Sequence, residues 1–145
     1  ETSRYHGWVV MRLALRRLPA SESWRHRISA WAIETRLVSN YCHSGIVIGD
    51  TLYHSNTTSG LHASTFDADK WELYDLAGSD TEALALFLRY RGTGYDWFSL
   101  LAFLLPGHIA DGRRLYCFEW CWLAITGEIP SQRISPEMLL TKAVR

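Results

Sequence analysis

Apolar and polar positions follow two different periods along the chain, and each period predicts its own class of element. Between residues 43 and 76, β-branched and aromatic residues form short runs separated by turn residues, which is typical of antiparallel strands. The expected strands are 43–48, 51–55, a shorter one at 61–65, and 70–76, where apolar and polar side chains alternate. Gly49 and Asp50 stand between the first two strands and indicate a hairpin turn. We therefore expect an antiparallel meander in the middle of the chain.

Helical patterns flank this meander. Ser79 followed by Glu82 is a capping box ahead of an expected helix at 81–91. Ser135 and Pro136 are typical of a helix start and predict a short terminal helix. Strands and helices in this order predict an α+β fold, and 145 residues suit a single domain spanning 1–145. Residues 8–15 fit a strand or a short helix, and their β-branched residues favour the strand. Two further patterns predict a helix from Ser21 or Ser23 to about Val38 and a helix from Trp97 that Pro106 stops.

Composition narrows the choice of partners. The 15 Lys and Arg residues equal the 15 Asp and Glu residues, so charge gives no reason to expect nucleic acid. The longest apolar run, 97–105, is too short for the roughly 20 residues that span a bilayer, so no membrane span is expected. Seven Trp and seven Tyr residues supply a large core, or the walls of a groove for a glycan or peptide.

The three cysteines are odd in number and widely spaced, which predicts free thiols rather than a disulfide framework. Cys117 lies in the first turn of an expected buried helix at 115–127, which follows a basic turn and ends at Gly127. Free backbone amides and the helix dipole at that end favour a thiolate, so a lowered thiol pKa is expected. Cys121 lies one turn further on and is expected to be a core residue. Cys42 is expected to pack on the other face of its strand.

A reactive thiolate needs an imidazole to carry its proton and a third polar group to orient that imidazole. His43, which opens the strand 43–48, is the predicted base. His54 and Asn56 on the next strand are both candidates for the third group. A two-residue turn at Gly49 and Asp50 would place both on the face of His43, whereas a three-residue turn would move His54 to the other face.

Zinc is a competing explanation for the same residue types. The potential ligands are Cys42, His43, His54, His62, Cys117 and Cys121. No Cys-x2-Cys or His-x3-His pair occurs among them, so neither a metal nor another cofactor is expected.

Two stretches carry a family resemblance: YCHSGIVIGDTLYHS at 41–55 and YCFEWCWLAITG at 116–127. They resemble the circularly permuted papain-like hydrolases related to NlpC-type peptidoglycan peptidases, including YiiX-like and phage-encoded proteins, in which histidine precedes cysteine. The resemblance implies a permuted papain-like fold, with an antiparallel sheet packed against a helix that bears the nucleophile. It also implies Cys117 as nucleophile, His43 as general base and His54 as orienter. Phe118 replaces the serine that commonly follows the cysteine, and the hairpin loop is one residue shorter than in more distant relatives of this family, the lecithin:retinol acyltransferase group.

The expected activity is hydrolysis of an amide bond through a thioester on Cys117. The resemblance points first to peptidoglycan peptides, cleaved by an amidase or endopeptidase that serves as a phage lysis enzyme or an antibacterial toxin. Such a protein would be made in the bacterial cytoplasm and delivered to the periplasm or cell wall, and it could meet an immunity or inhibitor protein. The alternatives are an acyl-ester, lipid or host-protein amide substrate, and a non-catalytic module that binds a glycan or peptide.

Overall fold

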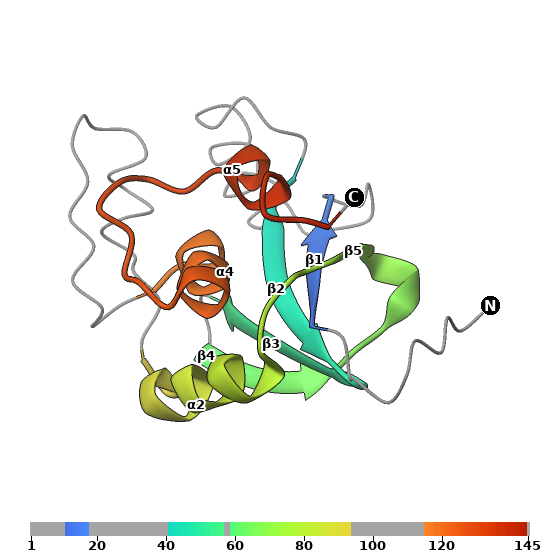
Figure 1. Cartoon of the computed structure of the whole chain (residues 1–145). Coiled ribbons are helices and arrows are strands. Elements are labelled where there is room, and N and C mark those ends of the chain that lie inside the picture. The colour runs from blue at the N-terminus through green and yellow to red at the C-terminus, as the bar shows by residue number, and fades with distance from the viewer. Residues whose placement is uncertain (1–10, 18–40, 57–58, 94–114, 145) are drawn as a thin grey trace.

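Five antiparallel strands form one sheet in the order β4-β3-β2-β1-β5 (Figure 1). We describe residues 11–17, 41–56, 59–93 and 115–144 of a computed structural model of the chain. The strands are β1 (Arg12–Arg16), β2 (His43–Ile48), β3 (Thr51–Asn56), β4 (Gly60–Thr65) and β5 (Glu72–Asp75). The helices are α2 (Asp80–Tyr90), α4 (Cys117–Thr126) and α5 (Pro136–Leu140), with a 3-10 turn, η1, at Ala68–Lys70.

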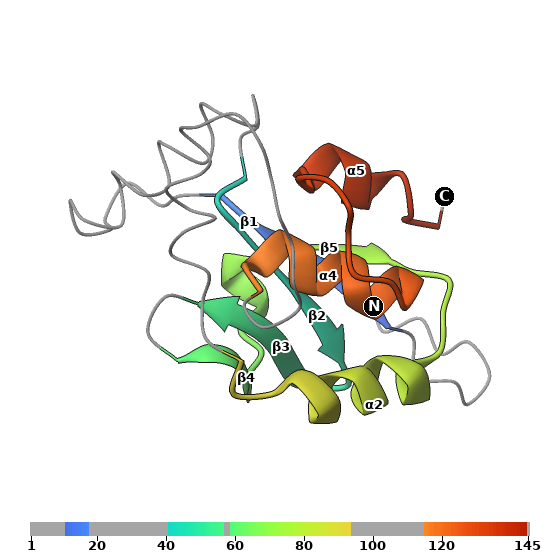
Figure 2. The same cartoon turned by 90° about the vertical axis from the view of Figure 1, so that its left-hand side faces the viewer.

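The main core lies between the sheet and helix α4. This helix packs on β2 and β3, and α2 lies alongside it (Figure 2). Its apolar side chains are almost completely buried, with Trp120 and Phe118 at 0% exposure. Leu13 and Ile46 contribute the facing side chains of β1 and β2. A smaller cluster of Ala14, Val47 and Leu52, with Trp71 and Leu73 packed against it, lies on the other side of the same strands. The sheet therefore has two apolar faces, and α4 covers the larger one.

Local signals account for the elements that the sequence predicts well. Ile48 pairs with Thr51, so Gly49 and Asp50 make the predicted two-residue turn, with Gly49 at φ 60°. Ser79 caps α2 by accepting a hydrogen bond from the Glu82 N–H at 3.2 Å. The strands at 43–48, 51–55 and 61–65 are confirmed, as are the helices at 81–91 and 115–127 within a residue or two at each end.

Other predictions were confirmed in part. The predicted terminal helix is present as α5, and β1 occupies part of the strand predicted at 8–15. Residues 8–10, the helix predicted up to Val38 and the helix predicted from Trp97 lie outside the described residues.

The last strand of the expected meander is in a different place. Strand β5 pairs with β1, with Leu13 opposite Tyr74, rather than continuing from β4. It is also shorter than the predicted 70–76, because Lys70 belongs to η1, whose first turn is capped by the Asp67 carboxylate. The meander prediction is therefore correct for β2 to β4 and wrong for β5.

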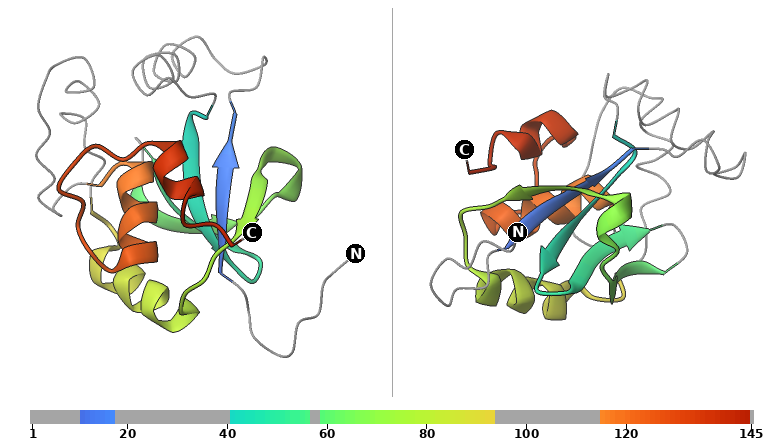
Figure 3. Two further views of the ribbon diagram at one scale, coloured as in Figure 1. Left: turned by 45° about the horizontal axis from the view of Figure 1, so that its top comes forward. Right: turned by 90° about the vertical axis from the view of Figure 1, so that its right-hand side faces the viewer.

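Both outer strands are contacted by segments from elsewhere in the chain. On β4, the Leu61 N–H donates to the Thr93 carbonyl at 3.0 Å, and the Gly92 N–H donates to the Leu61 carbonyl at 2.9 Å. Beyond β5, Leu76 forms a bridge with Ala143, and the Val144 N–H donates to the Asp75 carbonyl at 2.8 Å. Figure 3 shows the C-terminal segment returning to this side of the sheet.

Strands β2 and β3 pair only near their turn, and the pairing ends at Ile46 and Tyr53. At the open end of the hairpin, α4 and the residues just before it form hydrogen bonds with β3 in place of the ladder. The Trp120 indole N–H donates to the Tyr53 carbonyl at 2.8 Å, and the Ser55 hydroxyl donates to the Leu115 carbonyl at 2.6 Å. The start of α4 is therefore fixed over the place where the two strands separate.

None of the described helices has both the length and the apolar character that are needed to cross a bilayer.

We predict that Gly45→Ala destabilises the protein by about 2 kcal/mol, because overfilling a packed site forces its neighbours to shift. A Cβ atom at Gly45 would lie 2.5 Å from Leu52 Cδ1, 3.1 Å from His54 Cβ and 3.2 Å from the Tyr53 carbonyl oxygen. Urea unfolding followed by circular dichroism measures the change. Gly49→Asn is the control, because that turn position has open space and asparagine tolerates its positive φ. Equal stability of Gly45→Ala and the wild type would contradict the packing described at β2.

Candidate active site

A chain of hydrogen bonds joins His43 to the two strands that follow it. His43 Nε2 lies 2.9 Å from His54 Nδ1, and His54 Nε2 lies 3.0 Å from Ser64 Oγ. The three side chains come from β2, β3 and β4 and share one face of the sheet. The other candidate for the third position, Asn56, uses its Oδ1 to accept the Ser59 N–H at 2.7 Å. Of the two alternatives, the structure thus brings His54 to His43.

This connectivity restricts the tautomers that a base at His43 can have. The contact between His43 Nε2 and His54 Nδ1 holds one proton, so either His43 donates to His54 or His54 donates to His43. If His43 donates from Nε2 to His54 Nδ1, then His54 donates from Nε2 to Ser64, and His43 Nδ1 keeps a free lone pair. That direction gives His43 the form of a general base.

Aromatic rings surround the histidine pair. The Trp71 ring centroid lies 5.5 Å from that of His43 and 6.3 Å from that of His54. The ring centroids of His62 and His54 are 4.3 Å apart, and His62 Nδ1 is 2.8 Å from the Gly60 carbonyl oxygen. Sequence reasoning named His62 only as a potential zinc ligand and did not select Ser64 or Trp71. The register of the β3–β4 pair, in which His62 stands opposite His54, was the signal that could have identified the first two.

A polar cluster holds the chain just before β2. The Tyr41 hydroxyl donates to Glu72 Oε2 at 2.6 Å, and the Tyr74 hydroxyl donates to the same oxygen at 3.1 Å. Arg17 Nε donates to the other Glu72 oxygen at 2.9 Å. Tyr41 is only 8% exposed, so the cluster anchors β2 two residues before His43.

Cys117 is the first residue of α4 and is 1% exposed. Ser44 on β2 is close enough for its backbone and side chain to lower the pKa of the Cys117 thiol, against the larger effect of burial, which raises it. Ser44 also accepts a hydrogen bond from the Cys121 thiol at 3.2 Å. Side chains alternate along a strand, so Ser44 faces α4 and His43 faces the opposite side. Within the described part of the chain, Cys117 and His43 share no hydrogen bond, and the structure connects them only through adjacent residues of β2.

Hydrogen bonds fix the first turn of α4 at this position. The Tyr116 N–H donates to Glu119 Oε2 at 3.3 Å, and the Tyr116 hydroxyl accepts the Ile134 N–H at 2.9 Å. Glu119 is fully buried, and its carboxylate accepts the backbone N–H at the start of the helix.

Burial dominates the electrostatics of the site. It raises the pKa of the Cys117 thiol to about 12, although hydrogen bonds from Ser44 act in the opposite direction. Burial also lowers the pKa of His43 to about 3, with the neighbouring His54 and Arg16 adding to the effect. The pKa of His54 falls to about 4, again mainly through burial. The lowered thiol pKa expected from the helix start is therefore wrong for this conformation, in which thiol and imidazole are both neutral near pH 7.

The other two cysteines have distinct environments. All three cysteines are free. Cys121 is completely buried, as expected for a core residue, but its bond to Ser44 connects it to the environment of Cys117. Cys42 is partly exposed, and its thiol lies 3.5 Å from the Arg16 carbonyl oxygen.

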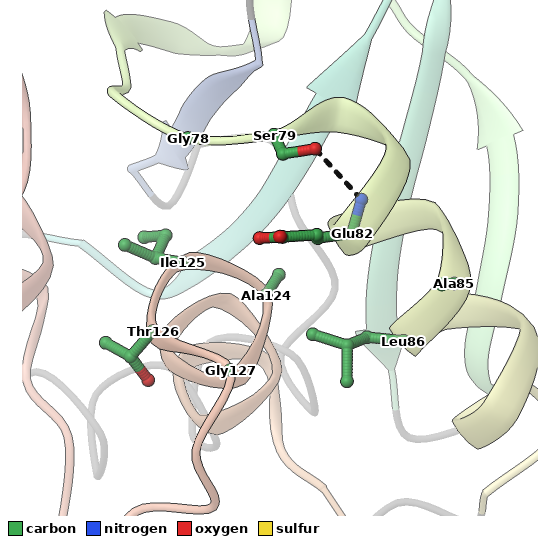
Figure 4. A pocket seen from close by; sticks show the side chains of 9 residues that line it. All are labelled: Gly78, Ser79, Glu82, Ala85, Leu86, Ala124, Ile125, Thr126 and Gly127. Carbon is green, nitrogen blue, oxygen red and sulfur yellow. Dashed lines mark hydrogen bonds between the residues drawn. The ribbon is translucent and has the colours of Figure 1, made fainter.

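Among the described residues, Cys117 belongs to no group of potential metal ligands and does not line the pocket. Among the described residues, no group of three or more His, Cys, Asp or Glu side chains is arranged to hold a metal ion. A pocket of about 330 Å³ lies between the start of α2 and the end of α4, lined by Ser79, Glu82, Leu86 and Gly127 among others (Figure 4). Cys117 begins α4, so this pocket is at the far end of the helix.

We predict that acid destabilises the protein through the histidine pair. The folded-state pKa values of His43 and His54 are about 3 and about 4, below the ordinary value of 6.5. As the pH falls below about 6.5, the unfolded state binds protons that the folded state does not, so the free energy of unfolding decreases. The expected loss between pH 7 and pH 5 is up to about 2 kcal/mol per histidine. Urea unfolding at the two pH values measures it.

The matched comparison is the double variant His43→Asn/His54→Asn, which should lose less stability over the same range. A wild type that is equally stable at pH 7 and pH 5 would show that the pair is not held neutral in the folded state.

Comparison with protein-family models, with curated proteins and with solved structures gives no match to this chain. The functional argument therefore depends on the chemistry of the histidine chain and of Cys117.

Proposed function

We propose that this chain is a cysteine hydrolase with a permuted papain-like fold, in which Cys117 is the nucleophile, His43 the general base and His54 the residue that orients it. The observation that carries the proposal is the hydrogen-bonded series from His43 through His54 to Ser64. A base needs a partner that fixes its tautomer, and this series leaves Nδ1 of His43 available. The first member of the series, His43, lies on the unpaired part of β2, next to Ser44, which influences the pKa of Cys117.

The proposed reaction has two stages. In the first, the Cys117 S–H proton moves to His43, the sulfur bonds to the amide carbon, and His43 returns the proton to the departing amine nitrogen as the C–N bond breaks. In the second, His43 takes a proton from water, the hydroxide attacks the thioester, and the proton goes back to the Cys117 sulfur as the S–C bond breaks. The backbone N–H of Cys117 at the helix start donates to the oxyanion in both stages.

The neutral thiol is compatible with this scheme only if the proton moves during attack. A thiol with a pKa of about 12 and an imidazole with a pKa of about 3 do not form an ion pair in the unliganded site. Catalytic hydrogen bonds are often absent before substrate binds and shorten in the complex. Because His43 and Ser44 point to opposite faces of β2 and Cys117 lies on the side of Ser44, the scheme requires a rearrangement around the start of β2 that brings His43 Nδ1 and the Cys117 sulfur together when substrate is present.

The proposed substrate is an amide bond of a peptidoglycan peptide, in the setting of a phage lysis enzyme or an antibacterial toxin. This choice rests on the sequence resemblance of 41–55 and 116–127 to NlpC-type proteins. An acyl ester, a lipid or a host-protein amide would use the same groups.

One observation favours a second candidate, a module that binds a glycan or peptide without cleaving it. Cys117 is 1% exposed, and its pKa is raised rather than lowered. A buried neutral thiol is typical of a structural cysteine.

We predict that Cys117→Ala and His43→Ala each lower the release of peptide fragments from purified sacculi by at least about 1,000-fold, because removing either member of such a pair stops the chemistry. Mass spectrometry of the soluble fragments measures release and identifies the bond cut. Cys42→Ser is the control, since it replaces a partly exposed thiol and keeps a donor for the Arg16 carbonyl. Full release by either site variant would remove that residue from the mechanism, and binding of sacculi without release by the wild type would favour the second candidate.

We also predict different effects of two substitutions at His54. His54→Asn keeps an oxygen that can accept the His43 Nε2–H and should retain part of the activity, whereas His54→Ala should lower kcat by about 100-fold or more. Rates on the fragment identified above, normalised to folded protein, give the comparison. Equal activity of His54→Ala and the wild type would assign the orienting role elsewhere.

A further inference from the structure

Ser64 is the last member of the hydrogen-bonded series, on the face of the sheet opposite α4. His54 Nε2 lies 3.0 Å from Ser64 Oγ, and His54 Nδ1 lies 2.9 Å from His43 Nε2. A hydroxyl, an imidazole and a third group on the other nitrogen of that imidazole are the parts of a nucleophilic triad. The three side chains come from β4, β3 and β2 and are already within hydrogen-bond distance of one another in sequence. Ser64 and His54 are both half-buried, so neither is closed off from a substrate.

The direction of the series decides which residue has a base. The thiol chemistry uses the direction in which His43 donates to His54. In the opposite direction Ser64 donates to His54 Nε2, and His54 donates from Nδ1 to His43 Nε2. His54 Nε2 then has the free lone pair that a base for the serine needs, and His43 fixes its tautomer. Burial lowers the pKa of His54 to about 4, so this lone pair carries no proton at neutral pH.

We propose that Ser64 is a second nucleophile, with His54 as its general base and His43 as the residue that positions His54, and that these three residues hydrolyse carboxylic esters. The inference goes beyond the thiol chemistry and does not depend on it. No rearrangement around the start of β2 is needed, because both contacts of the serine triad are present in the unliganded structure.

The reaction has two stages. In the first, the Ser64 hydroxyl proton moves to His54 Nε2 as Oγ bonds to the ester carbonyl carbon. His54 then gives the proton to the alcohol oxygen as the C–O bond breaks, and the acyl group stays on Ser64. In the second, His54 takes a proton from water and the hydroxide bonds to the acyl carbon. The proton goes back to Ser64 Oγ as the bond between Oγ and the acyl carbon breaks, which releases the carboxylic acid.

An apolar surface beside Ser64 indicates the kind of acyl group. Ser64 stands opposite Leu52, a member of the smaller apolar cluster of the sheet. The partly buried rings of Phe66 and Trp71 pack against this cluster. An apolar acyl chain would bury further surface there, whereas a charged chain would lose hydration. The substrate class is therefore an ester with an apolar acyl chain.

The test is covalent labelling of the full chain with an alkyl fluorophosphonate at neutral pH. Ser64 Oγ bonds to phosphorus, fluoride leaves, and the hydroxyl proton passes through His54 to water. The expected product is a single adduct, which tandem mass spectrometry of the peptides places on Ser64. This mapping uses the unmodified protein, so it decides the question even if Ser64→Ala fails to fold. Absence of an adduct, or an adduct on another residue, would overturn the proposal.

Histidine variants identify the base. His54→Ala should slow the labelling by at least about 100-fold, whereas His62→Ala should stay within about threefold of the wild type. His62 is the matched control because its ring packs on that of His54 while its Nδ1 lies 2.8 Å from the Gly60 carbonyl oxygen. Wild-type labelling of His54→Ala, or an equal loss in both variants, would overturn the assignment of His54 as base.

A conservative replacement tests the positioning role of His43. His43→Gln keeps an oxygen that can accept the His54 Nδ1–H, so it should label about tenfold faster than His43→Ala. Equal rates in these two variants would remove His43 from the triad.

Two chromogenic esters test the acyl group. p-Nitrophenyl butyrate should have a kcat/KM about tenfold above that of p-nitrophenyl acetate, the gain expected from burying two methylene groups. Equal values would overturn the assignment of an apolar acyl chain.

These readouts separate the two activities. If sacculi are not cleaved but Ser64 is labelled in a His54-dependent way, the proposed function fails and the serine triad stands. If sacculi are cleaved in a Cys117-dependent way and Ser64 is not labelled, the serine triad alone fails.

Discussion

The arrangement of this protein depends on the early end of the β2–β3 ladder. Pairing stops at Ile46 and Tyr53, and backbone groups beyond that point need other partners. The Trp120 indole of α4 donates to the Tyr53 carbonyl, and the Leu115 carbonyl just before the helix accepts the Ser55 hydroxyl. These two hydrogen bonds tie the first turns of α4 to the open end of the hairpin. An uninterrupted ladder would satisfy these groups within the sheet and leave α4 without a fixed register.

The hairpin and the helix boundaries were predictable because their determinants are local. Gly49 sets the turn, Ser79 caps α2 and Gly127 ends α4 in a left-handed conformation. The turn length placed both His54 and Asn56 on the face of His43, since register fixes which side chains share a face, but it did not decide between them. The position of β5 was not predictable in this way, because its pairing with β1 joins segments about 60 residues apart. That pairing places Trp71 next to His43 and His54. The contact of Trp71 with the histidines was therefore not predictable either.

The pKa of Cys117 shows a second limit of local reasoning. A helix start stabilises a thiolate by an amount that the sequence can indicate, but the desolvation of the sulfur depends on the side chains of the packed core. Here desolvation is the larger effect, and the hydrogen bonds from Ser44 offset only part of it. Catalysis by such a thiol depends on groups that compensate for lost water. The residue types most relevant to it are small buried donors, which composition and periodicity do not distinguish from ordinary core residues.

The contacts at the two outer strands have a consequence for how the protein meets other chains. Leu61 on β4 is bonded on both its N–H and its carbonyl to residues 92–93, and the end of β5 is bonded to residues 143–144. An extended peptide from another molecule therefore cannot run the full length of either edge by adding a strand. Such blunted edges limit edge-to-edge association between copies.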